Sequence, residues 1–222
     1  MSWLPVCLLL LWGPTPRSDD VATRTKHVLD RWQEEMEGLR SFECEFRQEK
    51  EVSFLRRPLV STGTIYYRDR RLLWKTVEPA PSYLALDEKS LRIYNPEFNT
   101  LEIFSFEPEA RSEGMIPGLT ADPRQLREHY HGELLDGAED GEFRLRFTPR
   151  HRREQSDVAH IEVTLSADYL LRAWTVSEMD GDLVHLTVTA FRPNVPVPDE
   201  KLELSVPDDV EIIRYDVEDQ AP

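Results

Sequence analysis

Cysteine is scarce in this chain of 222 residues, which has only Cys7 and Cys44. Cys7 lies in an N-terminal apolar run that we expect to be removed, so the processed chain would keep one cysteine and could form no internal disulfide. Cys44 sits in an alternating apolar and charged segment. Its expected role there is a small buried hydrophobe rather than a nucleophile.

Recognisable catalytic motifs are also missing. The sequence has no Gly-rich phosphate loop, no HExxH and no GxSxG. His129 and His131 lie near Glu133, but at the end of a short helix their side chains would point to different faces, which disfavours a shared metal. We therefore expect no catalytic residues, no metal site and no cofactor, and a protein that is not an enzyme.

Positive charge is in short supply. Lys and Arg number 27 against 42 Asp and Glu, which gives a net charge of -15 and a pI of about 4.9. Because nucleic-acid binding needs clustered Lys and Arg, this balance argues against a nucleic-acid partner, and we expect none. The length and the 40% hydrophobic content favour one folded domain with a substantial core.

The only long apolar run is at the N-terminus, over residues 3–12 (WLPVCLLLLW). It is too short to span a bilayer and matches the apolar region of a signal peptide. We expect residues 1–18 to be an export signal, 19–216 to form a single lipid-binding domain and 217–222 to be a disordered tail. No Lys or Arg precedes the run, so a misassigned start or a lipid-modified Cys7 remains open as an alternative.

Helical spacing follows over residues 21–41. Leu29, Trp32 and Met36 recur on one face, with polar residues on the other, and Asp19 or Asp20 is available as the N-cap. The apolar stripe indicates packing against a core or against whatever fills a barrel.

Residues 42–106 have strand periodicity. Phe42 and Phe46 share one face of a first strand, and five short apolar runs separated by turn residues follow it between 63 and 106. Leu72 and Trp74 fall on one face, as do Leu91 and Ile93. This predicts an antiparallel meander that forms one curved sheet, with one apolar and one polar face.

The pattern breaks over residues 107–122. Met115, Ile116 and Leu119 form an apolar patch between glycines, and Asp122-Pro123 predicts the start of a short helix over 124–131. A movable lid and an ordinary surface loop both fit this patch. Strands resume at 133–135, 143–147, 159–165, 170–178 and 183–191, and two last short strands are expected at 202–206 and 210–213.

Several segments resemble one family. Residues 61–68 (STGTIYYR), 72–74 (LLW), 78–79 (EP) and 86–96 (LDEKSLRIYNP) are similar to the run "SGTLYLKRP…FRW…P…SDGKTLWIYDP" of the periplasmic outer-membrane lipoprotein carrier (LolA-like) family. Residues 201–210 (KLELSVPDDV) resemble the "F-F-P-x-G-V" motif at the C-terminal end of the family's sequences.

The resemblance implies a mainly β fold with some α: an incomplete antiparallel β-barrel covered by an N-terminal helix and a mid-chain helical lid. It implies a monomeric periplasmic carrier that shields the acyl chains of lipoproteins and passes them from an inner-membrane ABC transporter to an outer-membrane receptor. The lipid cavity would be lined by Leu29, Trp32, Met36, Phe42, Phe46, Leu72, Trp74, Leu91 and Ile93.

Arg68 falls on the family's basic position, which the resemblance assigns as a latch to the backbone of the lid. Asp69 stands where the family usually has Pro, and Arg70 or Arg71 could serve as the latch instead. Two other functions remain open: a lipid sensor or outer-membrane receptor built on the same barrel, and an esterase, which would lack a nucleophile motif.

Overall fold

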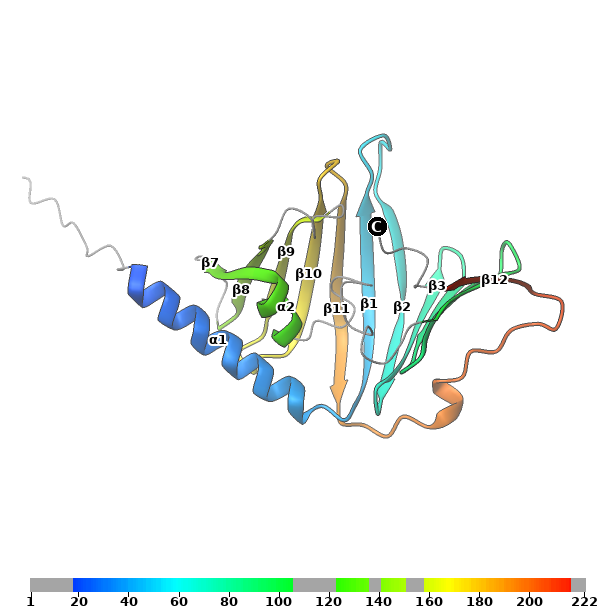
Figure 1. The fold of residues 1–222 in the computed structure, drawn as a ribbon, viewed down its shortest axis with the longest axis horizontal. Helices are drawn as coiled ribbons and strands as arrows, with labels where there is room; N and C mark the ends of the chain where they lie inside the picture. Colours follow the sequence, from blue (N-terminus) through cyan, green and yellow to red (C-terminus); the bar gives the residue numbers. More distant parts are fainter. Residues whose placement is uncertain (1–17, 106–122, 136–140, 151–157, 217–222) are drawn as a thin grey trace, which may run out of the picture.

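The computed structural model describes residues 18–105, 123–135, 141–150 and 158–216. They form one strongly curved sheet of twelve strands in the order β12-β6-β5-β4-β3-β2-β1-β11-β10-β9-β8-β7 (Figure 1). The strands are β1 Ser41–Glu51, β2 Leu59–Arg68, β3 Arg71–Glu78, β4 Ser82–Leu86, β5 Ser90–Asn95, β6 Thr100–Ser105, β7 Tyr130–Leu135, β8 Phe143–Pro149, β9 Val158–Leu165, β10 Leu171–Glu178, β11 Leu183–Pro193 and β12 Glu211–Asp216. The mainly β, open-barrel fold expected from the sequence is confirmed.

The N-terminal helix α1 (Ser18–Gly38) lies along one side of the curved sheet (Figure 1). Its buried face includes Val28, Leu29 and Trp32, whose side chains belong to the main core. The helix begins and ends about three residues before the predicted limits. Asp19 and Asp20 consequently lie inside its first turn, so the prediction that one of them caps the helix from outside was wrong.

The predicted meander is confirmed by the strand register. Ile65 on β2 lies opposite Trp74 on β3, Trp74 opposite Leu84 on β4, and Leu84 opposite Ile93 on β5. Directly paired residues project from the same face of a sheet. This row therefore lies on the concave face, which packs against α1 and holds the main core.

The alternation predicted a polar convex face, and this prediction was wrong for part of that face. Leu73 and Ala85 are buried there in a second cluster with Val197 and Leu202. The C-terminal segment 194–204, which we call the strap, crosses this face. Its only helical turn is η1 (Asp199–Lys201). The strand predicted at 202–206 was therefore wrong: these residues pack across the sheet instead of joining it.

The last described strand, β12, pairs in parallel with β6, which is more than a hundred residues earlier in the sequence. Ile212 on β12 lies opposite Leu101 on β6, so the last strand returns to the free edge of the meander. The mid-chain helix α2 (Pro123–His129) is shorter than predicted because His131 already belongs to β7. Within the described residues, no helix is both long and apolar enough to cross a membrane.

Candidate functional site

An apolar cavity lies between α1 and the concave face of the sheet. β1 runs through the middle of the sheet between β2 and β11, and its alternation directs Phe42 and Cys44 into this space. The register then brings Ile65 opposite Cys44 on one side and Phe191 opposite it on the other. Among the residues that the structure describes, the wall consists of Trp32, Met36, Leu39, Phe42, Cys44, Ile65, Trp74, Leu170, Leu171, Trp174, Leu186, Val188 and Phe191.

The observed cavity is small. It offers about 60 Å³, whereas pockets that enclose drug-sized ligands usually measure about 300–1,000 Å³. Aromatic side chains take up much of the space, and Phe46 and Trp74 pack with ring centroids 4.7 Å apart. A long apolar ligand could enter only if α1 or some of these side chains moved.

Trp32 contributes an unusual polar group to this apolar wall. Its side chain is fully buried, yet its indole N–H has no hydrogen-bond acceptor anywhere in the part of the chain that the structure describes. A buried donor without a partner costs free energy, about 1–3 kcal/mol. An acceptor on a bound molecule, such as an ester or amide carbonyl, would relieve that cost if it reached this nitrogen.

Cys44 is the one titratable group in the cavity wall. Burial, and to a smaller extent the nearby Glu45 carboxylate, raises the pKa of its thiol to about 12. The thiol is therefore protonated at neutral pH and behaves as a small hydrophobe, as the sequence predicted. A thiolate is the reactive form of cysteine, so this position is chemically inert in the observed conformation.

Polar contacts at the surface fasten the outer side of α1 to α2. Arg127 on α2 donates to Asp30 on α1 (2.5 Å), and Arg124 pairs with Glu37 (2.8 Å). These groups are all partly exposed to solvent, where ion pairs contribute little, about 0–1 kcal/mol each. Movement of α1 away from α2 would break these weak contacts at little cost, although it would also expose the apolar face of α1.

The comparisons with known proteins agree with this architecture. The family model described as "Outer membrane lipoprotein carrier protein LolA" matches residues 37–205. The chain belongs to this family. Comparison with curated protein sequences gives no match.

Among solved structures, an uncharacterized conserved protein from Thermus thermophilus shares the fold of this LolA family member. Its TM-score is 0.56 at 14% identity, with 86% of this chain and 99% of that chain covered. A LolA superfamily protein from Nitrosomonas europaea matches at a TM-score of 0.43 and 11% identity, covering 81% and 97% of the two chains. The lipoprotein LppX from Mycobacterium tuberculosis matches at 0.47 and 12%, covering 78% and 98%.

The residues predicted for the lipid cavity occupy three kinds of position. Trp32, Met36, Phe42 and Trp74 line the observed cavity. Leu29, Phe46 and Leu72 are buried in the core around it. Leu91 and Ile93 lie on the same concave face but two strands beyond Trp74, with Leu91 buried and Ile93 half-buried.

The sequence analysis missed the half of the wall that comes from β10 and β11. Trp174, Leu186 and Val188 lie in alternating segments of β10 and β11, so the sequence did carry a signal that they form a buried face. Phe191 departs from this alternation, and it faces the cavity because the register of β11 against β1 shifts by one residue between Val188 and Ala190. What was missing was the pairing of β11 with β1, because the strands are about 140 residues apart and no turn connects them.

Arg68, the predicted lid latch, contacts the strap. Its guanidinium donates hydrogen bonds to the Val197 carbonyl and the Asp199 carboxylate, and Arg71 donates to the same carboxylate at 2.9 Å. Arg70 lies 3.7 Å from Glu88. The lid patch at Met115, Ile116 and Leu119 lies outside the described residues, so a contact between it and any of these arginines stays a prediction.

The turn between β2 and β3 explains why this chain departs from the family's usual Pro. Asp69 and Arg70 have φ values of 49° and 65°, and Arg68 pairs directly with Arg71 across them. Two consecutive residues with positive φ form the tight hairpin that suits twisted strands. Proline, whose φ is fixed near −65°, could not occupy position 69 in this turn.

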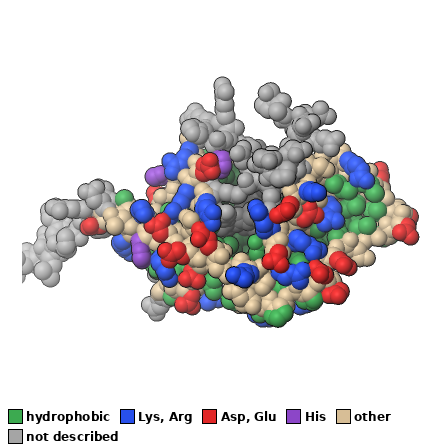
Figure 2. Space-filling view, turned by 60° about the horizontal axis from the view of Figure 1, so that its bottom comes forward, with side chains coloured by type: hydrophobic (Ala, Val, Ile, Leu, Met, Phe, Trp, Pro, Cys, Tyr) green, Lys and Arg blue, Asp and Glu red, His purple; other side chains and the backbone are tan. Residues whose placement is uncertain are grey.

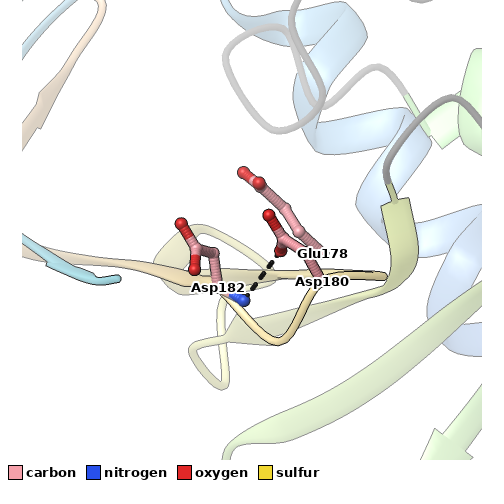
Figure 3. A group of neighbouring side chains, drawn as sticks. All are labelled: Glu178, Asp180 and Asp182. Carbon is pink, nitrogen blue, oxygen red and sulfur yellow. Dashed lines mark hydrogen bonds between the residues drawn. The ribbon is translucent and has the colours of Figure 1, made fainter. Parts of the chain in front are cut away.

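Figure 2 shows the end of the molecule opposite the β1–β2 turn, where Lys and Arg are interspersed with Asp and Glu. Within the described residues, one group of carboxylates could hold a metal ion: Glu178, Asp180 and Asp182 at the β10–β11 turn (Figure 3). Asp180 accepts a hydrogen bond from the Asp182 backbone N–H, and Asp182 accepts one from Ser53 N–H. Two of the three carboxylates thus accept backbone hydrogen bonds that stabilise the turns, so we assign the group a structural role and propose no metal site there.

Proposed function

We propose that this protein is a periplasmic carrier that shields the acyl chains of lipoproteins in the cavity under α1. It would receive them from an inner-membrane lipoprotein-releasing ABC transporter and deliver them to an outer-membrane receptor. The observation that carries the proposal is the continuous apolar wall between α1 and the concave face, in a member of the LolA family.

The chemistry of the wall supports an acyl cargo. Each methylene group removed from water contributes about 0.8 kcal/mol, so a cavity lined by Trp, Leu, Val and Phe side chains favours hydrocarbon chains strongly. The N–H of Trp32, which has no acceptor among the described residues, adds a hydrogen-bond donor for a carbonyl of the acyl linkage. A cargo with both features satisfies this wall better than a plain hydrocarbon does.

The small cavity volume supports a carrier that opens on loading and closes on release. In the closed form, the side chains of the wall pack against one another and satisfy the apolar surface without a ligand. Closure of the cavity then competes with the lipid for the same apolar surface, which limits the net free energy of lipid binding and permits release. The weak contacts between α1 and α2 make α1 a suitable moving part.

A carrier rather than an esterase is also favoured by the lack of nucleophile chemistry in the wall. Cys44 is the only candidate among the residues lining the cavity, and its high pKa keeps it protonated. Covalent catalysis requires an activated nucleophile with a base in hydrogen-bond reach. Turnover of acyl esters by the purified protein would contradict this part of the proposal.

Displacement of a fluorescent apolar dye tests the cargo. A triacylated lipopeptide should displace bound dye at lower concentration than a soluble fatty acid or a glycolipid. Met36→Lys, which introduces a charge into the wall from α1, should weaken dye binding by about tenfold or more. The matched control is Ala22→Lys on the exposed face of the same helix, which should bind like the unchanged protein.

The outcomes separate the competing functions. Failure of the protein to bind dye, or equal loss of binding in both lysine variants, would refute the cavity assignment. Preference for a glycolipid would support a sensor or carrier of other envelope lipids in place of the lipoprotein carrier. The receptor alternative predicts that the protein is itself anchored to the outer membrane, which fractionation of cell envelopes would reveal.

A further inference from the structure

Two hairpin tips at one end of the sheet leave apolar side chains in solvent. On the β1–β2 turn, Phe54 is 83% exposed and Leu59 is 57% exposed, and Leu55 and Val60 beside them are also exposed. On the neighbouring β10–β11 turn, Met179 is 65% exposed. Single exposed hydrophobic residues are common on protein surfaces, but a group of five on two adjacent tips calls for a partner.

The two tips are held next to each other. Glu51 at the end of β1 pairs with Leu183 at the start of β11, and Ser53 N–H donates to the Asp182 carboxylate across the turns at 2.8 Å. Figure 1 shows both hairpins projecting at the same end of the sheet, beyond the strands around them. We call Phe54, Leu55, Leu59, Val60 and Met179 the tip patch.

The charge of the β1–β2 tip differs from that of the whole protein. The net charge of the chain is -15, yet residues 52–60 (VSFLRRPLV) contain Arg56 and Arg57 and no acidic residue. Both arginines are exposed. On the neighbouring turn, Asp182 is buried and engaged with Ser53, whereas Asp180 is exposed. Among residues 52–60 and 179–182, the exposed charged side chains are therefore Arg56, Arg57 and Asp180, and positive charge is in excess there.

From this combination we infer that the tip patch inserts into the interface of an anionic phospholipid bilayer. Phe54 and Leu59 would enter the boundary between headgroups and acyl chains, while Arg56 and Arg57 would remain among the phosphates. A second protein is a poorer occupant, because a stable interface buries about 800 Å² on each partner and a narrow projecting tip offers little area. The inference is independent of the cavity and of its proposed cargo.

Vesicle binding of the full chain tests this inference. The unchanged protein should float with vesicles of phosphatidylethanolamine and phosphatidylglycerol, and bind phosphatidylcholine vesicles more weakly. The double variant Phe54→Ser/Leu59→Ser should bind at least about tenfold more weakly, because two apolar side chains lose their lipid contact. Arg56→Gln/Arg57→Gln should lose mainly the preference for the anionic vesicles.

The matched control is Phe98→Ser. Phe98 is 67% exposed in the turn between β5 and β6, which β3 and β4 separate from the tip patch, so its loss should leave vesicle binding unchanged. Phe54 and Phe98 are in exposed turns and Leu59 is exposed at the start of β2, so the substitutions should leave the fold intact. An unchanged urea midpoint of unfolding would verify this. Dye displacement by lipopeptide should be the same in the tip variants, which keeps this test separate from that of the cargo.

A second measurement reports insertion directly. In a Cys7→Ser background, Phe54→Cys would carry an environment-sensitive fluorophore while buried Cys44 stays unlabelled. A blue shift on adding anionic vesicles supports insertion. The inference is overturned by absence of the shift, by undiminished vesicle binding of the Phe54→Ser/Leu59→Ser variant, or by tip-dependent self-association without vesicles, which would assign the patch to a second copy.

Discussion

Arg68 on β2 and Asp199 on the strap are 131 residues apart in sequence, and the guanidinium of the first donates a hydrogen bond to the carboxylate of the second. The same arginine also donates to the carbonyl of Val197, which lies buried against the convex face. Arg68 therefore fastens the strap to the sheet on the face opposite the cavity.

Removal of this contact should loosen the strap. In Arg68→Ala, we expect amide protection over residues 195–202 to fall in hydrogen exchange, while β1 and β2 remain protected. Asp199→Asn should have the same effect at smaller amplitude, because the amide still accepts hydrogen bonds but carries no charge. Arg172→Ala, at an exposed position on β10, is the control.

The same variants distinguish the strap contact from the lid latch implied by the family. If Arg68 only fastens the strap, Arg68→Ala and Asp199→Asn should change the dye release rate to a similar, small extent. A large change confined to Arg68→Ala would show that the arginine has a second partner, as a lid latch requires.

Gly63 should tolerate no side chain. A Cβ at this position would lie 2.0 Å from the Lys75 carbonyl oxygen on β3 and 2.8 Å from Cζ of Phe46. Gly63→Ala should therefore lower the free energy of unfolding by about 1–3 kcal/mol in urea titration. Gly38→Ala, with nothing within 4 Å at the end of α1, should be neutral or stabilising by up to about 1 kcal/mol. Equal effects of the two substitutions would contradict the close packing of Phe46 over β2.

The attachment of the strap should depend on pH. The hydrogen bond from Arg68 holds the pKa of Asp199 below its ordinary value of 3.8, and the hydrogen bond from Lys201 holds that of Glu43 below 4.5 despite partial burial. A carboxyl whose folded pKa is lowered stabilises the fold above its unfolded pKa and loses this contribution as the pH falls through the folded value.

We therefore expect the unchanged protein to be more stable than Glu43→Gln/Asp199→Asn at neutral pH. The difference between their urea midpoints should shrink as the solution is acidified below the ordinary carboxyl pKa values. A difference that stays constant down to acid pH would show that charge on these two carboxylates does not hold the strap.

Cys44 offers a reporter of cavity opening. Its side chain is 3% exposed, and burial raises the pKa of its thiol to about 12, so alkylation at mildly alkaline pH should be at least about a hundredfold slower in the folded protein than in urea. In the Cys7→Ser background, Arg127→Ala should speed labelling by about two- to fivefold because it removes a contact between α2 and α1. Arg172→Ala should leave the rate unchanged. Labelling of the folded protein at the rate seen in urea would contradict a closed cavity.

How far the sequence predicted the structure depended on the distance between pairing partners. The β2–β6 meander was predicted because each strand pairs with its neighbour across a short turn, and alternation set the faces of Leu72 and Trp74. The β1–β11 and β12–β6 pairings have no local signal, so half of the cavity wall was missed. The last strand was predicted at 210–213, but its parallel pairing with β6 was not. Leu202 follows strand-like alternation, but packing against Leu73 and Val197 decided its conformation.

Arg68 illustrates the same limit for a functional residue. The family resemblance implied a latch to the lid. In the structure, Tyr67 packs on the concave face, so its neighbour Arg68 projects from the convex face. Its partner on that face is the strap, about 130 residues later in the sequence, and no local pattern identifies this partner.

The most direct test of the carrier account is whether the protein keeps an acylated lipopeptide in solution without detergent. After incubation with a triacylated lipopeptide, size-exclusion chromatography followed by native mass spectrometry should detect a one-to-one complex at the size of a protein monomer. Met36→Lys should reduce this complex, and Ala22→Lys should retain it. Lipopeptide found only in large aggregates, with the protein eluting free of lipid, would contradict the account.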